Sequence, residues 1–165
     1  MFQPTSNITE QIADHLTWEI VTGRLPDRAR IQELKLAKEL DVSRGSVREA
    51  LLLLQGRHLV EIVPRKGASV RPLDQQDIEP FGELFADLLA RALRRVKLTP
   101  GERDLALLEP ICMAAKQGET EALIRERQRV LRELAGRSND RYLLSVLDPL
   151  FATAGRIAFV ATRHR

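Results

Sequence analysis

The stretch DVSRGSVREALLLLQG, residues 41–56, places two arginines, Arg44 and Arg48, ahead of four consecutive leucines. Ser43 belongs to the residue types that favour the position just before a helix, so a helix is predicted to begin after it. One face of this helix follows the i, i+3, i+4, i+7 spacing of a buried stripe and consists of Val47, Ala50, Leu51 and Leu54. The stretch is therefore predicted to be a helix with a cationic head and an apolar tail that packs on its neighbours.

The segments on both sides complete a small domain. Apolar residues recur every four positions over 8–23, which predicts a helix there. Asn7 and Glu10 can form a capping box at its start, and Gly23 is predicted to end it. After a connection containing proline, IQELKLAKEL (31–40) predicts a second, short helix. Short β-prone runs flank PRKG, which predicts a hairpin over 59–70. Three helices followed by a hairpin match the plan of a winged helix-turn-helix domain over residues 1–72.

The rest of the chain has helical patterning. The segment PLDQQD is polar, which predicts a linker at residues 73–77. The helical spacing of apolar residues after it predicts an all-α domain over residues 78–165. Thr99, Pro100 and Glu102 form a strong start signal for one helix, and Gly118 separates it from a helix over about 120–135. A last helix begins near 139–140 and must break near Pro149. The predicted apolar stripe of the first helix consists of Phe81, Leu84, Phe85, Leu88, Ala92 and Val96. The fold class is therefore mainly α.

Composition excludes several classes of protein. The chain has 165 residues, of which 44% are hydrophobic and 30% charged, as in globular proteins. The longest apolar run, the four leucines, is far too short for a membrane span, and the N-terminus has no secretory signal. The single cysteine, Cys112, excludes an internal disulfide and is predicted to lie in a helix core. We therefore expect a cytoplasmic protein with no membrane partner.

Positive charge is concentrated in one part of the chain. The net charge is only +3, but residues 43–72 contain six basic and two acidic side chains. Residues 73–165 are nearly balanced, with fifteen basic and fourteen acidic groups. A polyanion therefore has one obvious binding region. The six basic residues are Arg44, Arg48, Arg57, Arg65, Lys66 and Arg71.

This pattern predicts contacts with DNA. In a helix-turn-helix, the first turn of the second helix of the motif approaches base edges in the major groove, where its free amides favour phosphate. Arg44 is long enough for bidentate contact with guanine, and Arg48 lies one turn later. Small residues between them let the backbone approach DNA, and the basic hairpin tip is predicted to contact the minor groove or its phosphates. The predicted DNA-binding residues are Ser43, Arg44, Gly45, Ser46, Arg48, Arg65, Lys66 and Gly67.

The segment LAKELDVSRGSVREALLLLQGRHLVEIVPRKGASV, residues 36–70, closely resembles the signature of GntR-type bacterial transcription regulators. That signature has glycine where this chain has Asp41 and His58, and Thr-Pro where it has Gly45-Ser46. The resemblance covers residues 8–72 and implies the DNA-contacting role of Ser43, Arg44, Arg48 and the hairpin tip.

The C-terminal helices resemble a shortened effector domain of the FadR/VanR-like branch of that family. Members of this branch often bind a divalent metal through an Asp and three His, but the histidine of the third-helix motif is missing here, where Glu126 to Val130 stand. His15, His58 and His164 are too scattered to form a site. The sequence therefore predicts no metal site and no cofactor, and it indicates no effector-binding residues.

The sequence predicts a DNA-binding transcription regulator, a repressor, that acts as a homodimer through its C-terminal helices on a pseudo-palindromic operator of double-stranded DNA. Response to a small-molecule effector of unknown identity is part of this expectation. No arrangement of catalytic residues emerges, so an enzyme is not expected. Two alternatives stay open. One is a DNA-binding dimer without any small-molecule effector, and the other is a winged helix that binds proteins. The operator, the effector and the direction of regulation do not follow from the residues.

Overall fold

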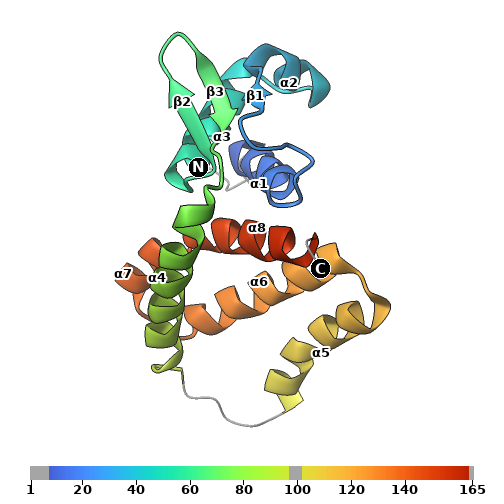
Figure 1. Ribbon diagram of the computed structural model, residues 1–165, viewed down its shortest axis with the longest axis vertical. Helices are drawn as coiled ribbons and strands as arrows, with labels where there is room; N and C mark the ends of the chain where they lie inside the picture. The colour runs from blue at the N-terminus through green and yellow to red at the C-terminus, as the bar shows by residue number, and fades with distance from the viewer. Residues whose placement is uncertain (1–7, 97–101, 164–165) are drawn as a thin grey trace, which may run out of the picture. The chain divides into compact units, whose positions relative to one another are not determined.

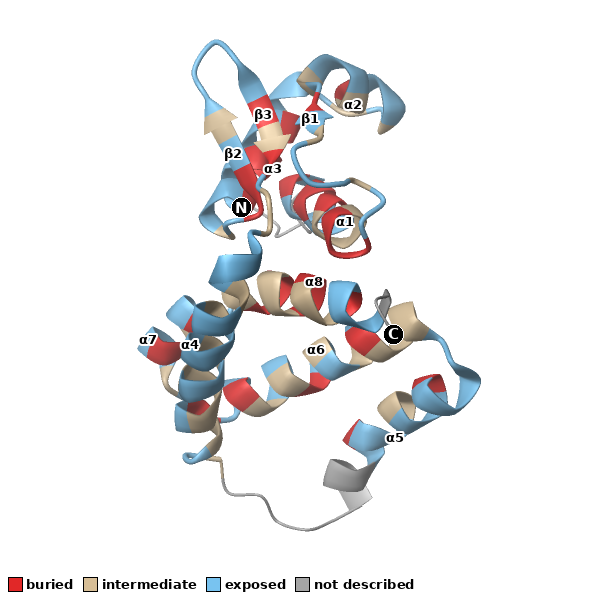
Figure 2. Cartoon of the chain, viewed as in Figure 1, coloured by how far each residue is buried: buried red, intermediate tan, exposed pale blue. Residues whose placement is uncertain are grey.

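The computed structural model describes residues 8–96 and 102–163, except for the side chains of 102–105 and 163. The chain divides into two compact units, Met1–Leu73 and Asp74–Arg165, here called the N-terminal unit and the C-terminal unit. Each unit is built around its own set of buried apolar side chains (Figure 2).

The N-terminal unit has the predicted winged helix-turn-helix architecture (Figure 1). Its three helices are α1 (Ile8–Val21), α2 (Glu33–Glu39) and α3 (Arg44–Gly56), and α3 packs on α1, α2 and the sheet. Strands β2 (Val60–Val63) and β3 (Gly67–Val70) form the antiparallel hairpin, with Glu61 opposite Ser69. The predicted fold class is confirmed for this part of the chain.

A short strand that the sequence analysis missed extends the hairpin into a three-stranded sheet. Strand β1 (Arg30–Ile31) lies in the segment interpreted as a connection and pairs antiparallel with β3, giving the order β1-β3-β2. Ile31 is buried, whereas Arg30 is exposed. Two residues are too few to produce an alternating pattern, so this pairing has no local signal in the sequence.

The four leucines of α3 divide into two buried and two exposed residues. The predicted buried face is confirmed, with Leu51 at 1% and Leu54 at 0% exposure. Leu52 and Leu53, in contrast, are 54% and 40% exposed. The expectation that all four leucines pack on neighbours was therefore wrong for these two, because consecutive residues of a helix point about 100° apart.

Most of the predicted helix ends in the N-terminal unit agree with the structure. Helix α1 ends at Val21, and Gly23 follows it with a left-handed φ of +69°. The Ser43 side chain caps α3 by accepting a hydrogen bond from the Ser46 amide, as its residue type predicted. Asn7, the first member of the expected capping box, lies outside the described residues.

The C-terminal unit is all-α, as predicted. It consists of α4 (Gln75–Leu93), α5 (Glu102–Gln117), α6 (Thr120–Gly136), α7 (Arg141–Leu147) and α8 (Leu150–Arg163). Helix α6 packs against α4, α5 and α8, and α4 also packs against α7. One buried cluster joins α4, α6, α7 and α8 and consists of Ala92, Ala135, Leu143, Leu147 and Phe151.

Boundaries in the C-terminal unit agree with the sequence only in part. The break near Pro149 is confirmed, since α7 ends at Leu147 and α8 begins at Leu150. Helix α4 begins at Gln75, so the last three residues of the expected linker are helical. The start signal at 99–101 lies outside the described residues.

One prediction of a buried side chain in this unit was wrong, since Cys112 on α5 is exposed. Leu84, on the expected apolar stripe of α4, is 53% exposed within the single chain. Val96, the last residue of the expected stripe, lies beyond the end of α4. Helical periodicity identifies which residues share a face but does not say whether a neighbouring element covers that face.

Among the described residues, no single helix is long and apolar enough to cross a membrane, and only α7 and α8 together, with a 42° bend between them, reach such a length and composition.

Candidate nucleic-acid interface

The start of α3 is a fixed turn built by two serines. The Ser43 Oγ accepts a hydrogen bond from the Ser46 amide at 3.0 Å, and the two hydroxyl oxygens lie 2.8 Å apart. This cap makes Arg44 the first residue of the helix. The positive end of the helix dipole and the remaining free amides of this turn favour an anion such as phosphate.

Arg44 and Arg48 lie one helical turn apart, so both belong to the same side of α3. Arg44 is 68% exposed, but its Nε donates a hydrogen bond to the Glu33 Oε2 of α2 at 3.0 Å. Arg48 is exposed, and its guanidinium has no ion-pair or hydrogen-bond partner among the residues that the structure describes. Both side chains are therefore available for contacts outside the protein. Arg44 is held by Glu33, and Arg48 has no partner among the described residues.

Glu33 is a site residue that the sequence analysis missed. It lies in the first turn of α2, eleven positions before Arg44, and its side chain is only 21% exposed. An acidic residue in the first turn of a helix is common for reasons of the helix dipole alone. Its pairing with Arg44 depends on how α2 packs against α3, which no local spacing in the sequence reveals.

Gly45 is not required by the packing of the free protein. A Cβ at this position would lie 3.6 Å from the Ser43 Oγ, which is ordinary van der Waals contact, and the residue is exposed. Its φ also lies outside the left-handed region. The absence of a side chain at 45 therefore matters only toward something outside the domain, such as a nucleic-acid backbone.

The tip of the β2–β3 hairpin presents two free cations. The Lys66 amide donates to the Val63 carbonyl at 3.0 Å, which closes a turn containing Pro64 and Arg65. Arg65 adopts a left-handed φ of +64° and Gly67 one of +87°. Among the described residues, the Arg65 and Lys66 side chains have no ion-pair or hydrogen-bond partner, and both are exposed. In Figure 1 this tip and α2, which α3 follows closely in sequence, lie at the same end of the N-terminal unit.

The basic segment 43–72 contains both paired and unpaired cations. Arg57 donates to Asp14 at 2.9 Å and to Thr17 at 3.1 Å, which joins the end of α3 to α1. Arg71 lies 3.5 Å from Glu61. These two arginines thus have partners within the unit, and the unpaired positive charge is concentrated at Arg48 and the hairpin tip.

The structure shows why the GntR-type signature has glycine at two positions where this chain departs from it. Asp41 and His58, which stand where that signature has glycine, adopt left-handed φ values of +51° and +58°. Glycine adopts this conformation without strain, and aspartate tolerates it better than most residues. At His58, the Nδ1 lies 3.3 Å from the Arg71 guanidinium, which provides one compensating contact.

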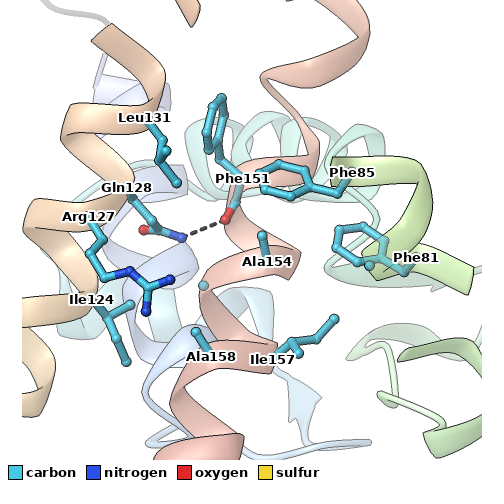
Figure 3. Close-up of a pocket in the computed structure, with 12 residues that line it drawn as sticks. Phe81, Phe85, Ile124, Arg127, Gln128, Leu131, Phe151, Ala154, Ile157 and Ala158 are labelled. Atoms are coloured by element: carbon cyan, nitrogen blue, oxygen red, sulfur yellow. Dashed lines mark hydrogen bonds between the residues drawn. The ribbon is translucent and has the colours of Figure 1, made fainter. Parts of the chain in front are cut away.

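A second candidate site lies within the C-terminal unit. A cavity of about 230 Å³ is lined by residues of α4, α6 and α8 (Figure 3). Its aromatic wall contains Phe81, Phe85 and Phe151, with the Phe85 and Phe151 rings edge to face at 5.4 Å. The cavity is mainly apolar, which suits the apolar part of a small ligand.

Two polar side chains of α6 enter this cavity. Gln128 Nε2 donates to the Phe151 carbonyl at 2.5 Å, and Gly155 leaves the space that the Gln128 amide occupies. Arg127 is exposed, and Figure 3 shows its guanidinium extending toward α8. It has no ion-pair partner among the described residues, so the cavity has one cation available for an anionic group.

The described residues contain no group of three or more His, Cys, Asp or Glu side chains that could hold a metal ion.

Comparison with known proteins shows which family and which regulators this chain is similar to. Residues 8–70 match the family model described as "Bacterial regulatory proteins, gntR family". The chain is 28% identical over 155 residues to the HTH-type transcriptional regulator McbR of Escherichia coli (strain K12), covering 90% of this chain and 69% of McbR. It is also 28% identical to a protein of Bacillus subtilis (strain 168) named "Uncharacterized HTH-type transcriptional regulator YdhC", covering 84% of this chain and 64% of YdhC. The chain thus spans about two thirds of the length of each relative.

The solved structure of McbR is similar over both units. It superposes with a TM-score of 0.77 at 25% sequence identity, covering 96% of this chain and 77% of McbR. Assignment to the narrower FadR/VanR-like branch stays a prediction. Residues 8–70 of this chain therefore carry a winged helix-turn-helix domain that matches the GntR family of bacterial regulatory proteins.

Proposed function

We propose that this chain regulates transcription by binding double-stranded DNA with the first turn of α3 in the major groove. The observation that carries the proposal is the pair Arg44 and Arg48, one turn apart and exposed at a serine-capped helix start. Arginine makes bidentate contacts with O6 and N7 of guanine. Ser43, Gly45 and Ser46 place small groups next to these arginines, and the amides of this turn other than that of Ser46, which donates to Ser43, remain for a phosphate.

The hairpin tip supplies the second contact in this proposal. Arg65 and Lys66 lie on a short turn with Gly67, exposed and unpaired among the described residues. Cations at such a tip contact phosphates beside the minor groove, which positions the domain without selecting a base. The α3 start therefore provides sequence discrimination, and the tip provides affinity.

The proposal extends to a homodimer on a pseudo-palindromic operator, because symmetric half-sites mirror a two-fold protein. Support comes from large apolar side chains that stay exposed in the C-terminal unit, such as Leu84, Tyr142 and Val146. A relative from Paenarthrobacter nicotinovorans, 34% identical over 44% of this chain, carries the name "Probable D-xylose utilization operon transcriptional repressor". We infer repression, a cytoplasmic location and no enzymatic activity.

The test begins with selection of duplexes from a random pool by the purified full chain, which should enrich an inverted repeat. Lys66→Ala should then weaken binding to the selected duplex and to a scrambled duplex by a similar factor. It should also lower the slope of log K against log salt by roughly 1, because one phosphate contact and its counterion release are lost. Fluorescence anisotropy over a salt series measures both quantities.

Lys116→Ala is the matched control, since Lys116 is an exposed lysine in the last turn of α5. This variant should leave affinity and salt slope unchanged. The proposal fails if selection enriches no sequence, or if binding of the unmodified chain is independent of salt.

A second candidate function is the binding of a small apolar anion in the cavity of the C-terminal unit. The presence of the Arg127 guanidinium in the same cavity as the phenylalanine rings is the observation that favours it. Such a ligand would bury its apolar part against the rings and place its charge at the guanidinium. This would make the regulator responsive to a metabolite.

Benzoate is a suitable probe, with benzyl alcohol as its neutral counterpart. At about 100 times its dissociation constant, benzoate should stabilise the protein by about 2.7 kcal/mol in thermal denaturation followed by circular dichroism. Arg127→Ala should remove the preference for benzoate over benzyl alcohol, whereas Arg94→Ala, at the exposed C-cap of α4, should keep it. Equal effects of both probes on the unmodified chain would exclude an anion site at Arg127.

A further inference from the structure

The ion pair between Glu33 and Arg44 joins the two helices of the helix-turn-helix at the surface proposed to face DNA. The Arg44 Nε donates to the Glu33 Oε2 at 3.0 Å. The two side chains differ in environment, since Glu33 is 21% exposed and Arg44 is 68% exposed. The carboxylate is thus the better-anchored partner, and the guanidinium is the part that extends into solvent.

The contact uses only one edge of the guanidinium. A guanidinium has five N–H donors in a planar fork, and bidentate contact with guanine needs two of them. Because Glu33 accepts from Nε, the two terminal nitrogens of Arg44 remain for O6 and N7. A free arginine must lose rotamer freedom when it binds a base, and a side chain already held at Nε loses less.

We propose that Glu33 is a positioning residue for base recognition, which holds the Arg44 guanidinium in the orientation that contacts guanine. This inference rests on the proposed function, in which the start of α3 enters the major groove. Glu33 also has a second effect, because its negative charge repels phosphate and therefore weakens binding to DNA of any sequence. The first effect raises the ratio of specific to non-specific affinity, whereas the second lowers both affinities by a similar factor.

A purely structural role of the pair leads to a different expectation. As a link between α2 and α3, the pair would contribute little to stability because Arg44 is largely exposed. Its loss would then change the affinity for all duplexes by the same factor, through charge alone. The two roles are therefore separated by the ratio of affinities rather than by either affinity.

The experiment compares Glu33→Gln with the unmodified chain on two duplexes of equal length, the selected one and its scrambled form. Glu33→Gln should weaken binding to the selected duplex about two- to tenfold, the range expected for one hydrogen bond to a charged group that becomes neutral. It should leave binding to the scrambled duplex unchanged or tighter. In the background of Arg44→Ala, Glu33→Gln should no longer change the ratio of the two affinities.

Glu39→Gln is the matched control, since Glu39 lies on the same helix, is 57% exposed and pairs with Lys35 rather than with α3. It should leave the ratio unchanged, and thermal denaturation should show that both variants stay folded. An unchanged ratio in Glu33→Gln, or the same change with and without Arg44, would overturn the inference. If the unmodified chain itself does not distinguish the two duplexes, the proposed function fails instead, so the two failures are distinguishable.

Discussion

Replacing Leu54 by alanine should lower the free energy of unfolding of the N-terminal unit by about 2–5 kcal/mol. Leu54 is fully buried on the face of α3 that packs against α1 and the sheet. The loss combines the transfer free energy of the removed carbons with the cost of the cavity that remains. Urea denaturation followed by the fluorescence of Trp18 measures it selectively, because this is the only tryptophan in the chain and lies on α1.

Leu52→Ala is the control for this prediction. It makes the same chemical change two positions earlier on α3, but Leu52 is 54% exposed, so stability should change by no more than about 0.5 kcal/mol. Similar losses in the two variants would contradict the packing of α3 described above.

Replacing Arg48 by alanine should reduce discrimination at one base pair of the operator by roughly 1–3 kcal/mol. The same range is expected for Arg44→Ala. Because the Arg48 guanidinium has no partner among the described residues, its removal should not change protein stability. Competition anisotropy with the selected duplex and its single base-pair variants, at one salt concentration, measures the effect.

Arg48→Lys separates charge from geometry at this position. Lysine keeps the positive charge but not the planar fork, so it should keep the affinity for scrambled DNA and still lose discrimination at that base pair. If the alanine variants of Arg44 and Arg48 both bind every duplex as the unmodified chain does, these arginines do not contact bases.

The parts of the fold that could be predicted are those with a local physical signal. The cap at Ser43, the buried face of α3 and the hairpin each depend on residues within a few positions of one another. Strand β1 and the Glu33–Arg44 pair were missed, because they join residues that are distant in sequence through packing. Local patterns contain no information about such pairings.

The C-terminal unit was harder to predict for a related reason. The spacing of its apolar residues predicted helices, and the structure has them, but exposure at Leu84 and Cys112 depends on which helix covers which face. The cavity beside Phe151 likewise combines side chains from three helices. In the sequence, Arg127 looks like any other charged residue of an amphipathic helix.

The left-handed backbone at Arg65 has a consequence for protein engineering. Glycine is the residue that adopts this conformation without strain, so a screen for heat resistance alone would favour glycine there. The same exchange would delete one of the two free cations at the hairpin tip. Directed evolution of this regulator therefore needs a selection for operator occupancy in every round, since thermostability by itself would select against part of the proposed DNA-binding surface.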